Sequence, residues 1–451
     1  MIPLPRALTG NGIVARALRG SAITAAGYAF SQVLRLASNL ILTRLLFPEA
    51  FGMMALVSVF LVGLAMFSDA GVGASISQNP RGDDPDFLNT GWTIQVVRGV
   101  LLWLATCAMA LPVAHFYGAP DLVLLLPVSG LALLVAGFNP TRMETANRHL
   151  LLGRVTGLDL ISQVIGILVM VLLAWVVPSV WALVVGSLLG AVARLALMNR
   201  YLPGLRNHFR WEPAAGRELV HFGKWIFLST ACGFLLFQGD KAILAAYMSL
   251  EMLGIYNIGY FLASFPGLLG GAVIGRVLIP IYRDNPPAAS AMNFARLRRM
   301  RCGMTAGILG MLVVLAFIGV PLVGVLYDAR YVQAGPILVV IACAQMPMVI
   351  GLTYDQAALA AGDSRNFFLL IATKAAVQTV AFIVGIEMAG LLGALAAQGV
   401  AMLLAYPMLI WLARRHGAWD ALHDAVFGLF AVVAAGLALW MNGPAILALA
   451  G

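Results

Sequence analysis

A row of polar side chains runs through an otherwise apolar stretch near the start of the chain. Its members recur at steps of three and four residues, which places them on one face of a helix: Thr24, Tyr28, Ser31, Gln32, Arg35, Ser38 and Asn39. Arg35 lies about 14 residues into this stretch, or ~21 Å along a helix axis. A guanidinium pairs with phosphate through two parallel hydrogen bonds. The face around Arg35, with Tyr28, Gln32 and Asn39, is therefore a candidate site for an anionic substrate.

Other charged groups interrupt the later apolar stretches. The cations are Arg98, Lys224, Arg276 and Lys374, with Gln378 one helical turn beyond the last, and the acids are Asp69, Asp159 and Asp355. A charge inside a membrane-spanning helix costs at least ~2.5–3.5 kcal/mol, so each group needs a partner or a hydrated cavity. We add the four cations and Gln378 to the candidate substrate site. Two simpler interpretations remain: Arg35 forms an ion pair with Asp69, and Arg98 and Lys224 extend to the membrane surface.

The elements that must position these residues are membrane-spanning helices. The chain has 451 residues, of which 61% are hydrophobic and only 10% charged, against about 25% charged in soluble proteins. Apolar runs of about 20 residues match the hydrocarbon thickness, and backbone groups in lipid must be satisfied within each helix. The sequence predicts an all-α polytopic membrane protein of about 12 to 13 spans, at 21–43, 51–74, 91–113, 121–139, 155–177, 179–200, 222–247, 253–280, 302–326, 334–357, 366–388, 390–413 and 421–441.

Charge in the loops predicts the orientation. Arginines gather in the N-terminal tail and in every second loop, whereas the opposite loops carry only Arg44, Lys241 and Arg330. The positive-inside rule therefore places the N-terminus in the cytoplasm. The loop 78–90 is predicted to be cytoplasmic although its acidic residues outnumber its single arginine. This does not change the predicted orientation, since acidic residues influence orientation little.

The division into domains follows from the longest cytoplasmic loop. We predict a cytoplasmic tail (1–20), an N-lobe of six spans (21–200), a cytoplasmic linker (201–221), a C-lobe of six spans (222–413) and an extra span with a tail (414–451). The turn Pro48–Gly52 resembles Leu250–Gly254 at an offset of 202 residues, with Glu49 matching Glu251. Six spans are an even number, so the two lobes would be related by a pseudo-two-fold axis along the membrane normal.

Several functional classes are disfavoured by the sequence. The four cysteines have no CxxC spacing, the six histidines form no ligand pattern, and the aspartates at 83, 84 and 86 are typical of a solvated loop. No metal site or cofactor is expected. The net charge of +9 is explained by the cytoplasmic loops rather than by nucleic acid. There is no P-loop that would drive transport directly.

Four motifs in a fixed order resemble a known family. They are Leu42–Gly52, Phe67–Val72, Gly239–Leu244 followed by Glu251–Tyr256, and Gly324–Tyr331. Together they are similar to Wzx-type polysaccharide flippases of the multidrug/oligosaccharidyl-lipid/polysaccharide exporter superfamily, over roughly residues 20–415.

The resemblance implies both a fold and a function. Two six-helix lobes would face a central cavity in the bacterial inner membrane. An undecaprenyl-diphosphate-linked oligosaccharide would cross by alternating access, for surface or exopolysaccharide biosynthesis. Coupling to H⁺ or Na⁺ is an expectation for the family, with Asp69 and Asp355 as candidate carboxylates. The expected partners are the lipid-linked glycan, membrane lipid, and a glycan polymerase and glycosyltransferases.

Three other functions compete with this interpretation. A cation-coupled drug or metabolite antiporter of the same superfamily would be expected to have an acidic cavity. A lipid II-type flippase would share the cationic cavity but normally has fourteen spans. A membrane-embedded polysaccharide polymerase or ligase would need a large outward loop, and the predicted outward loops are short.

Overall fold

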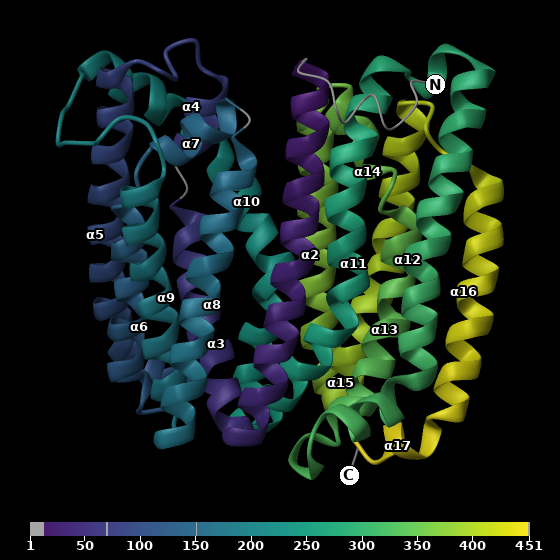
Figure 1. Ribbon diagram of the computed structural model, residues 1–451. Coiled ribbons are helices and arrows are strands. Elements are labelled where there is room, and N and C mark those ends of the chain that lie inside the picture. Colours follow the sequence, from purple (N-terminus) through teal and green to yellow (C-terminus); the bar gives the residue numbers. More distant parts are fainter. Residues whose placement is uncertain (1–12, 69–70, 150, 450–451) are drawn as a thin grey trace. The chain divides into compact units, whose positions relative to one another are not determined.

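The computed structural model describes residues 13–68, 71–149 and 151–449 (Figure 1). Throughout these ranges the regular elements are helices. The chain divides into two compact units, Met1–Ala231 and Cys232–Gly451. The boundary falls within α10 (Pro213–Tyr247), just beyond the predicted linker 201–221. The predicted lobes and their symmetry remain predictions.

The first unit is a bundle of long helices with two short ones at one end. Its elements are α2 (Ile13–Leu45), α3 (Pro48–Phe67), α4 (Val72–Gln78), α5 (Pro85–Phe116), α6 (Leu122–Gly137), α7 (Arg142–Arg148), α8 (Leu152–Val176), α9 (Val180–Tyr201) and the first part of α10. Helix α8 packs against α2 and α9, α5 packs against α6, and the short helices α4 and α7 contact each other. Helices α8 and α9 approach closely because glycines face each other: a Cβ on Gly166 would lie 3.2 Å from the Cα of Gly190.

The second unit is built around one buried helix. Its elements are the rest of α10, α11 (Leu250–Asp284), α12 (Ala291–Leu326), α13 (Ala334–Gly351), α14 (Asp355–Ala360), α15 (Ser364–Arg415), α16 (Ala421–Met441) and α17 (Gly443–Leu447), with 3₁₀ turns at Pro287–Ala289 and Ala329–Tyr331. Helix α13 is apolar around nearly its whole circumference, and it packs against α11, α12, α15 and α16. A helix that is hydrophobic all round belongs in the centre of a bundle.

Helix α15 is a hairpin that contains two predicted spans. Its 52 residues would measure ~78 Å if straight, far more than a hydrocarbon core. The backbone leaves helical geometry at Ala389 and Gly390, where Gly390 has φ 55°. The two ends of the hairpin then meet, because Oδ2 of Asp363 at its start lies 3.1 Å from Nε2 of His416 at its end. The predicted spans 366–388 and 390–413 are therefore the two antiparallel limbs.

The described part of the chain confirms a multi-pass helical membrane protein. Nine of its helices are long and apolar enough to cross a membrane, or ten if α6 and α7, which are bent by 57°, form one broken span. One of the nine is the α15 hairpin. Two predicted spans are interrupted. Within the predicted span 51–74, α3 ends at Phe67 and α4 begins at Val72, after Gly71 with its φ of 63°. Within 334–357, α13 ends at Gly351 and α14 begins at Asp355.

Candidate functional site

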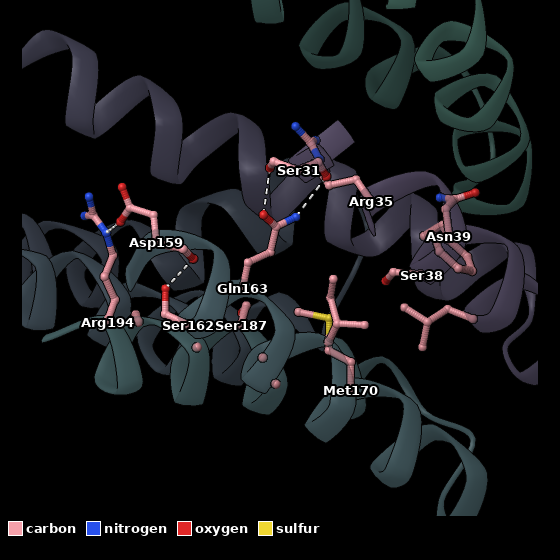
Figure 2. Close-up of a pocket in the computed structure, with 17 residues that line it drawn as sticks. Ser31, Arg35, Ser38, Asn39, Asp159, Ser162, Gln163, Met170, Ser187 and Arg194 are labelled. Carbon is pink, nitrogen blue, oxygen red and sulfur yellow. Dashed lines mark hydrogen bonds and ion pairs between the residues drawn. The ribbon is translucent and has the colours of Figure 1, made fainter. Parts of the chain in front are cut away.

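A cavity of about 520 Å³ with both polar and apolar lining residues lies within the first unit (Figure 2). Helices α2, α8 and α9 form its walls, with Phe51 from α3. Its polar lining residues are Ser31, Arg35, Ser38 and Asn39 from α2, Asp159, Ser162 and Gln163 from α8, and Ser187 and Arg194 from α9. Four residues of the polar face predicted for residues 21–43 therefore line a cavity.

Two of the predicted site residues on α2 line this cavity and two do not. Arg35 and Asn39 are lining residues, and the Arg35 side chain is exposed. Gln32 is 4% exposed, and no described residue hydrogen-bonds to its Oε1. Tyr28 is half-buried and lies outside the lining set. The polar face is thus wider than the cavity that it borders.

Hydrogen bonds fix α2 against α8 beside Arg35. The hydroxyl of Ser31 donates to Oε1 of Gln163 at 2.6 Å, and Nε2 of Gln163 donates to the Ser31 carbonyl at 3.1 Å. Figure 2 shows both bonds at the edge of the cavity. This reciprocal pair holds α2 in the rotation that presents Arg35 and Asn39 to the cavity.

An ion pair between α8 and α9 also lines the cavity. Nε of Arg194 lies 2.6 Å from Oδ1 of Asp159, and the two side chains are 37% and 39% exposed (Figure 2). The described lining residues therefore include two guanidinium groups and one carboxylate, so these residues together carry a net positive charge. Asp159 was among the charged residues identified from the sequence, whereas Arg194 was not predicted. The signal was present, because Arg194 interrupts the apolar run of α9 just as Arg35 interrupts α2.

Arg98 makes contacts away from the cavity. Its Nε donates to the hydroxyl of Ser68 at 2.9 Å, and a terminal nitrogen donates to the Ala65 carbonyl at 2.6 Å. These bonds tie α5 to the C-terminal end of α3, where carbonyls have no partner within the helix. Asp69, the predicted partner of Arg35 and a predicted coupling group, lies outside the described residues.

The remaining predicted residues belong to the second unit or are not described. Nζ of Lys374 lies 3.0 Å from Oδ2 of Asp355, and these side chains are 13% and 15% exposed. Gln378 is buried, and its Nε2 donates to the Leu236 carbonyl at 3.1 Å. The side chains of Lys224 and Arg276 are outside the described part of the chain. Of the described residues in this group, Lys374, Asp355 and Gln378 are not among the lining residues of the first unit's cavity.

The chemistry of the cavity suits binding rather than bond-making. Guanidinium groups and neutral hydroxyls and amides can hold an anion and hydrogen-bond a polar cargo. Among the described residues, no group of three His, Cys, Asp or Glu side chains could hold a metal ion.

The fold is shared with solved membrane transporters. An inward-facing multidrug resistance MATE family transporter of the MOP superfamily matches with a TM-score of 0.66 at 13% identity, covering 86% of this chain and 95% of that one. Lipid II flippase MurJ in an inward closed conformation also matches with 0.66, at 12% identity over 93% and 98% of the two chains. Identities this low establish the fold alone.

Sequence relatives come from polysaccharide biosynthesis. Succinoglycan biosynthesis transport protein ExoT of Rhizobium meliloti (strain 1021) is 24% identical over 54% of this chain and 49% of its own length. Lipopolysaccharide biosynthesis protein WzxC of Escherichia coli (strain K12) is 23% identical over the same shares. The chain thus matches about half the length of these relatives.

The four motifs that resemble Wzx-type proteins lie within a region that matches a family profile. The profile described as polysaccharide biosynthesis protein matches residues 41–336, well over half of the chain. The resemblance is confirmed, and this chain belongs to the polysaccharide biosynthesis protein family.

Proposed function

We propose that the protein is a flippase for undecaprenyl-diphosphate-linked oligosaccharides in the bacterial inner membrane, with its N-terminus in the cytoplasm. It would serve surface or exopolysaccharide biosynthesis. The observation that carries the proposal is the cationic cavity of the first unit, which lies among long helices of a polysaccharide biosynthesis protein. Multidrug exporters and a lipid II flippase have the same fold, so the fold does not select the cargo, and the family favours a glycan.

The cavity offers what the head of such a substrate needs. A diphosphate brings about two negative charges into a low-dielectric region, where an unpaired charge costs several kcal/mol. Arg35 would pair with the phosphate, while Asp159 already neutralises much of Arg194. Asn39 and the serines of the lining can hydrogen-bond sugar hydroxyls. The apolar polyprenyl chain can stay in the lipid while the polar head crosses.

Alternating access would expose this cavity first to the cytoplasm and then to the periplasm, driven by an H⁺ or Na⁺ gradient. Asp69 and Asp355 are our candidate coupling carboxylates. The close pair between Asp355 and Lys374 supports a role for Asp355, because protonation of the carboxylate would remove the attraction that joins α14 to α15. Glycosyltransferases would act before transport, and a glycan polymerase would act after it.

The test replaces Arg35 with Ala and with Lys in a strain that depends on this protein. We expect Arg35→Ala to reduce surface polysaccharide by about tenfold or more, since a hydrogen-bonded charge contributes ~1.5–3 kcal/mol. Lipid-linked precursor should accumulate on the cytoplasmic face. Arg35→Lys should retain part of the activity, because Lys keeps the charge but loses the bidentate geometry.

Arg44→Ala is the matched control, because Arg44 is an exposed arginine of the same helix outside the cavity lining. Protein levels in the membrane must be equal. Normal polymer in Arg35→Ala would remove Arg35 from the transport site. Precursor that reaches the periplasm in a strain lacking the protein would refute the flippase proposal itself.

A further inference from the structure

A second cationic pocket lies in the first unit, separate from the cavity at Arg35. Its volume is about 450 Å³, and it is lined by residues from α5, the loop between α6 and α7, α7, α9 and the loop that follows α9. Arg142 and Arg206 are its charged lining residues, and none of the described residues that line it is acidic. A pocket with two guanidinium groups and no carboxylate in its lining has an electrostatic preference for anions.

Arg142 is held in place with donor capacity to spare. It is 6% exposed, and a terminal nitrogen donates to the Leu202 carbonyl at 2.8 Å. Its Nε has no hydrogen-bond partner among the described residues. Gly204 allows the loop to pass directly over this side chain: its φ is 133°, and a Cβ there would lie 2.9 Å from Cβ of Arg142. A buried guanidinium that is not fully hydrogen-bonded is costly unless an anion completes it.

Arg206 is the accessible cation of the pocket. It is exposed, and it makes no ion pair within the part of the chain that the structure describes. The neighbouring Arg210 differs, since its Nε lies 2.7 Å from Oδ1 of Asp86. Asn207 fixes the loop beside Arg206, because it donates to the hydroxyl of Thr141 at 2.7 Å and accepts from the Thr141 N–H at 3.0 Å. The loop therefore keeps Arg206 at the pocket.

Aromatic rings border the pocket. The rings of Trp92 and Phe209 lie 5.0 Å apart, and Trp92 also meets Phe138 at 6.2 Å. Phe209 is 65% exposed. Exposed aromatic side chains beside arginines are typical of the boundary between hydrocarbon and headgroups, where phosphates are concentrated. The positive-inside rule predicts that the end of the first unit with this pocket faces the cytoplasm.

Helix α9 contributes to both cationic sites. Arg194 lines the cavity, whereas Asn199, about five residues or ~7.5 Å further along the axis, lines the pocket. The two sets of lining residues share no member. A group bound at the pocket would thus lie near the predicted cytoplasmic end of the helix that also borders the cavity.

We propose that this pocket is a phosphate-binding site, in which Arg206 and Arg142 hold the phosphate of a headgroup or a soluble phosphate compound. The inference goes beyond the transport site and does not depend on it. The recognised chemistry is a phosphate or diphosphate oxygen cluster paired with two guanidinium groups.

The test measures binding to the purified full-length protein in detergent by calorimetry. The probes are inorganic pyrophosphate and short-chain phosphatidylglycerol. We expect at least one probe to bind, with the Kd raised about tenfold by Arg206→Ala, because a hydrogen bond to a charged group contributes ~1.5–3 kcal/mol. Arg206→Glu should abolish binding, and Arg206→Lys should restore part of it. Pyrophosphate binding alone identifies a soluble phosphate, phosphatidylglycerol binding alone identifies a lipid headgroup, and binding of both identifies the shared phosphate.

The matched control is Arg200→Ala, since Arg200 is an exposed arginine at the end of α9 that does not line the pocket. It should bind as the native protein does. Failure of both probes to bind the native protein, or unchanged affinity in Arg206→Glu, would overturn the inference. Loss of binding in Arg35→Ala but not in Arg206→Glu would place the probe in the cavity, which would leave the proposed function standing.

Discussion

At the scale of single residues, the described structure shows that charges inside this protein differ in what they can do. Arg35 faces a cavity from α2, whereas Arg98 is used to hold α5 against α3. Arg194 and Asp159 form an ion pair in the lining of the same cavity as Arg35. The residue type was the same for all three arginines, and only their surroundings separate a binding group from a structural one.

Lys374 and Asp355 allow a direct test of a buried ion pair. Lys374→Ala removes the cation beside the carboxylate of Asp355, whose side chain is only 15% exposed in the native structure. We expect the free energy of unfolding to fall by about 3–5 kcal/mol, which is typical when one partner of a buried pair is removed. Thermal unfolding in detergent measures this as a lower Tm.

The double variant Lys374→Ala/Asp355→Ala is the control for that prediction. Removing both charges should recover much of the lost stability, because no uncompensated charge remains. If the single variant Lys374→Ala has the same Tm as the native protein, the ion pair contributes nothing to the stability of the fold.

At the scale of elements, the two helix turns that share a motif are built alike. Helix α2 ends at Leu45 and α3 begins at Pro48, and α10 ends at Tyr247 and α11 begins at Leu250. The helix end at Tyr247 lies 202 residues after that at Leu45, and the helix start at Leu250 lies 202 residues after that at Pro48. This is the same offset as between the two motifs. Both second helices carry a glutamate in the first turn, where negative charge is favourable.

Helix α16 is anchored at its start by a buried carboxylate. Asp420 is the N-cap residue, and its carboxylate accepts two hydrogen bonds from Arg298 and one from the N–H of His423. The hydrogen bonds from Arg298 chiefly hold the pKa of Asp420 below its usual value of 3.8. The side chain of Asp420 is 1% exposed. The thirteenth predicted span is thereby fixed to α12.

This carboxylate predicts how stability depends on pH. Because the folded pKa of Asp420 is lowered, its contribution is fully present above pH 3.8 and is lost as the pH falls through the folded pKa. Arg298→Ala should lower the Tm at pH 7, and the difference from the native protein should narrow as the pH falls below about 3.8. Thermal unfolding across pH 3–7 measures this, and a difference that does not change with pH would contradict it.

At the scale of the whole molecule, the chain consists of two compact units that each have their own helical core. The cavity at Arg35 and the pocket at Arg142 and Arg206 both lie within the first unit. The second unit contains the Lys374–Asp355 pair, the α15 hairpin and the anchored helix α16. Each unit therefore positions its own charged groups by contacts within itself.

The predicted duplication fixes which turns share a side of the membrane. After removal of the native cysteines, single cysteines at Phe47 and Ser249 should both react with an impermeant maleimide added from outside. These two sites and Arg200 are exposed. A cysteine at Arg200 should react only after the membrane is opened, because it lies in a predicted cytoplasmic loop. Labelling of Phe47 and Ser249 from opposite sides would rule out a repeat of six parallel spans.

The sequence by itself determined the membrane-spanning helices, the polar face of α2 and the family. Hydrocarbon forces each span to satisfy its own backbone hydrogen bonds, so a run of about 20 apolar residues specifies a helix without long-range contacts. The three- and four-residue spacing around Arg35 is equally local. These features follow from neighbours in the chain.

Tertiary structure alone decided which polar groups meet. The pairing of Arg194 with Asp159 depends on how α8 and α9 are rotated against each other at their glycines. The meeting of Asp363 with His416 depends on the reversal at Gly390. Helix rotation and chain reversal are set by packing between distant segments, and no local pattern in the sequence records them.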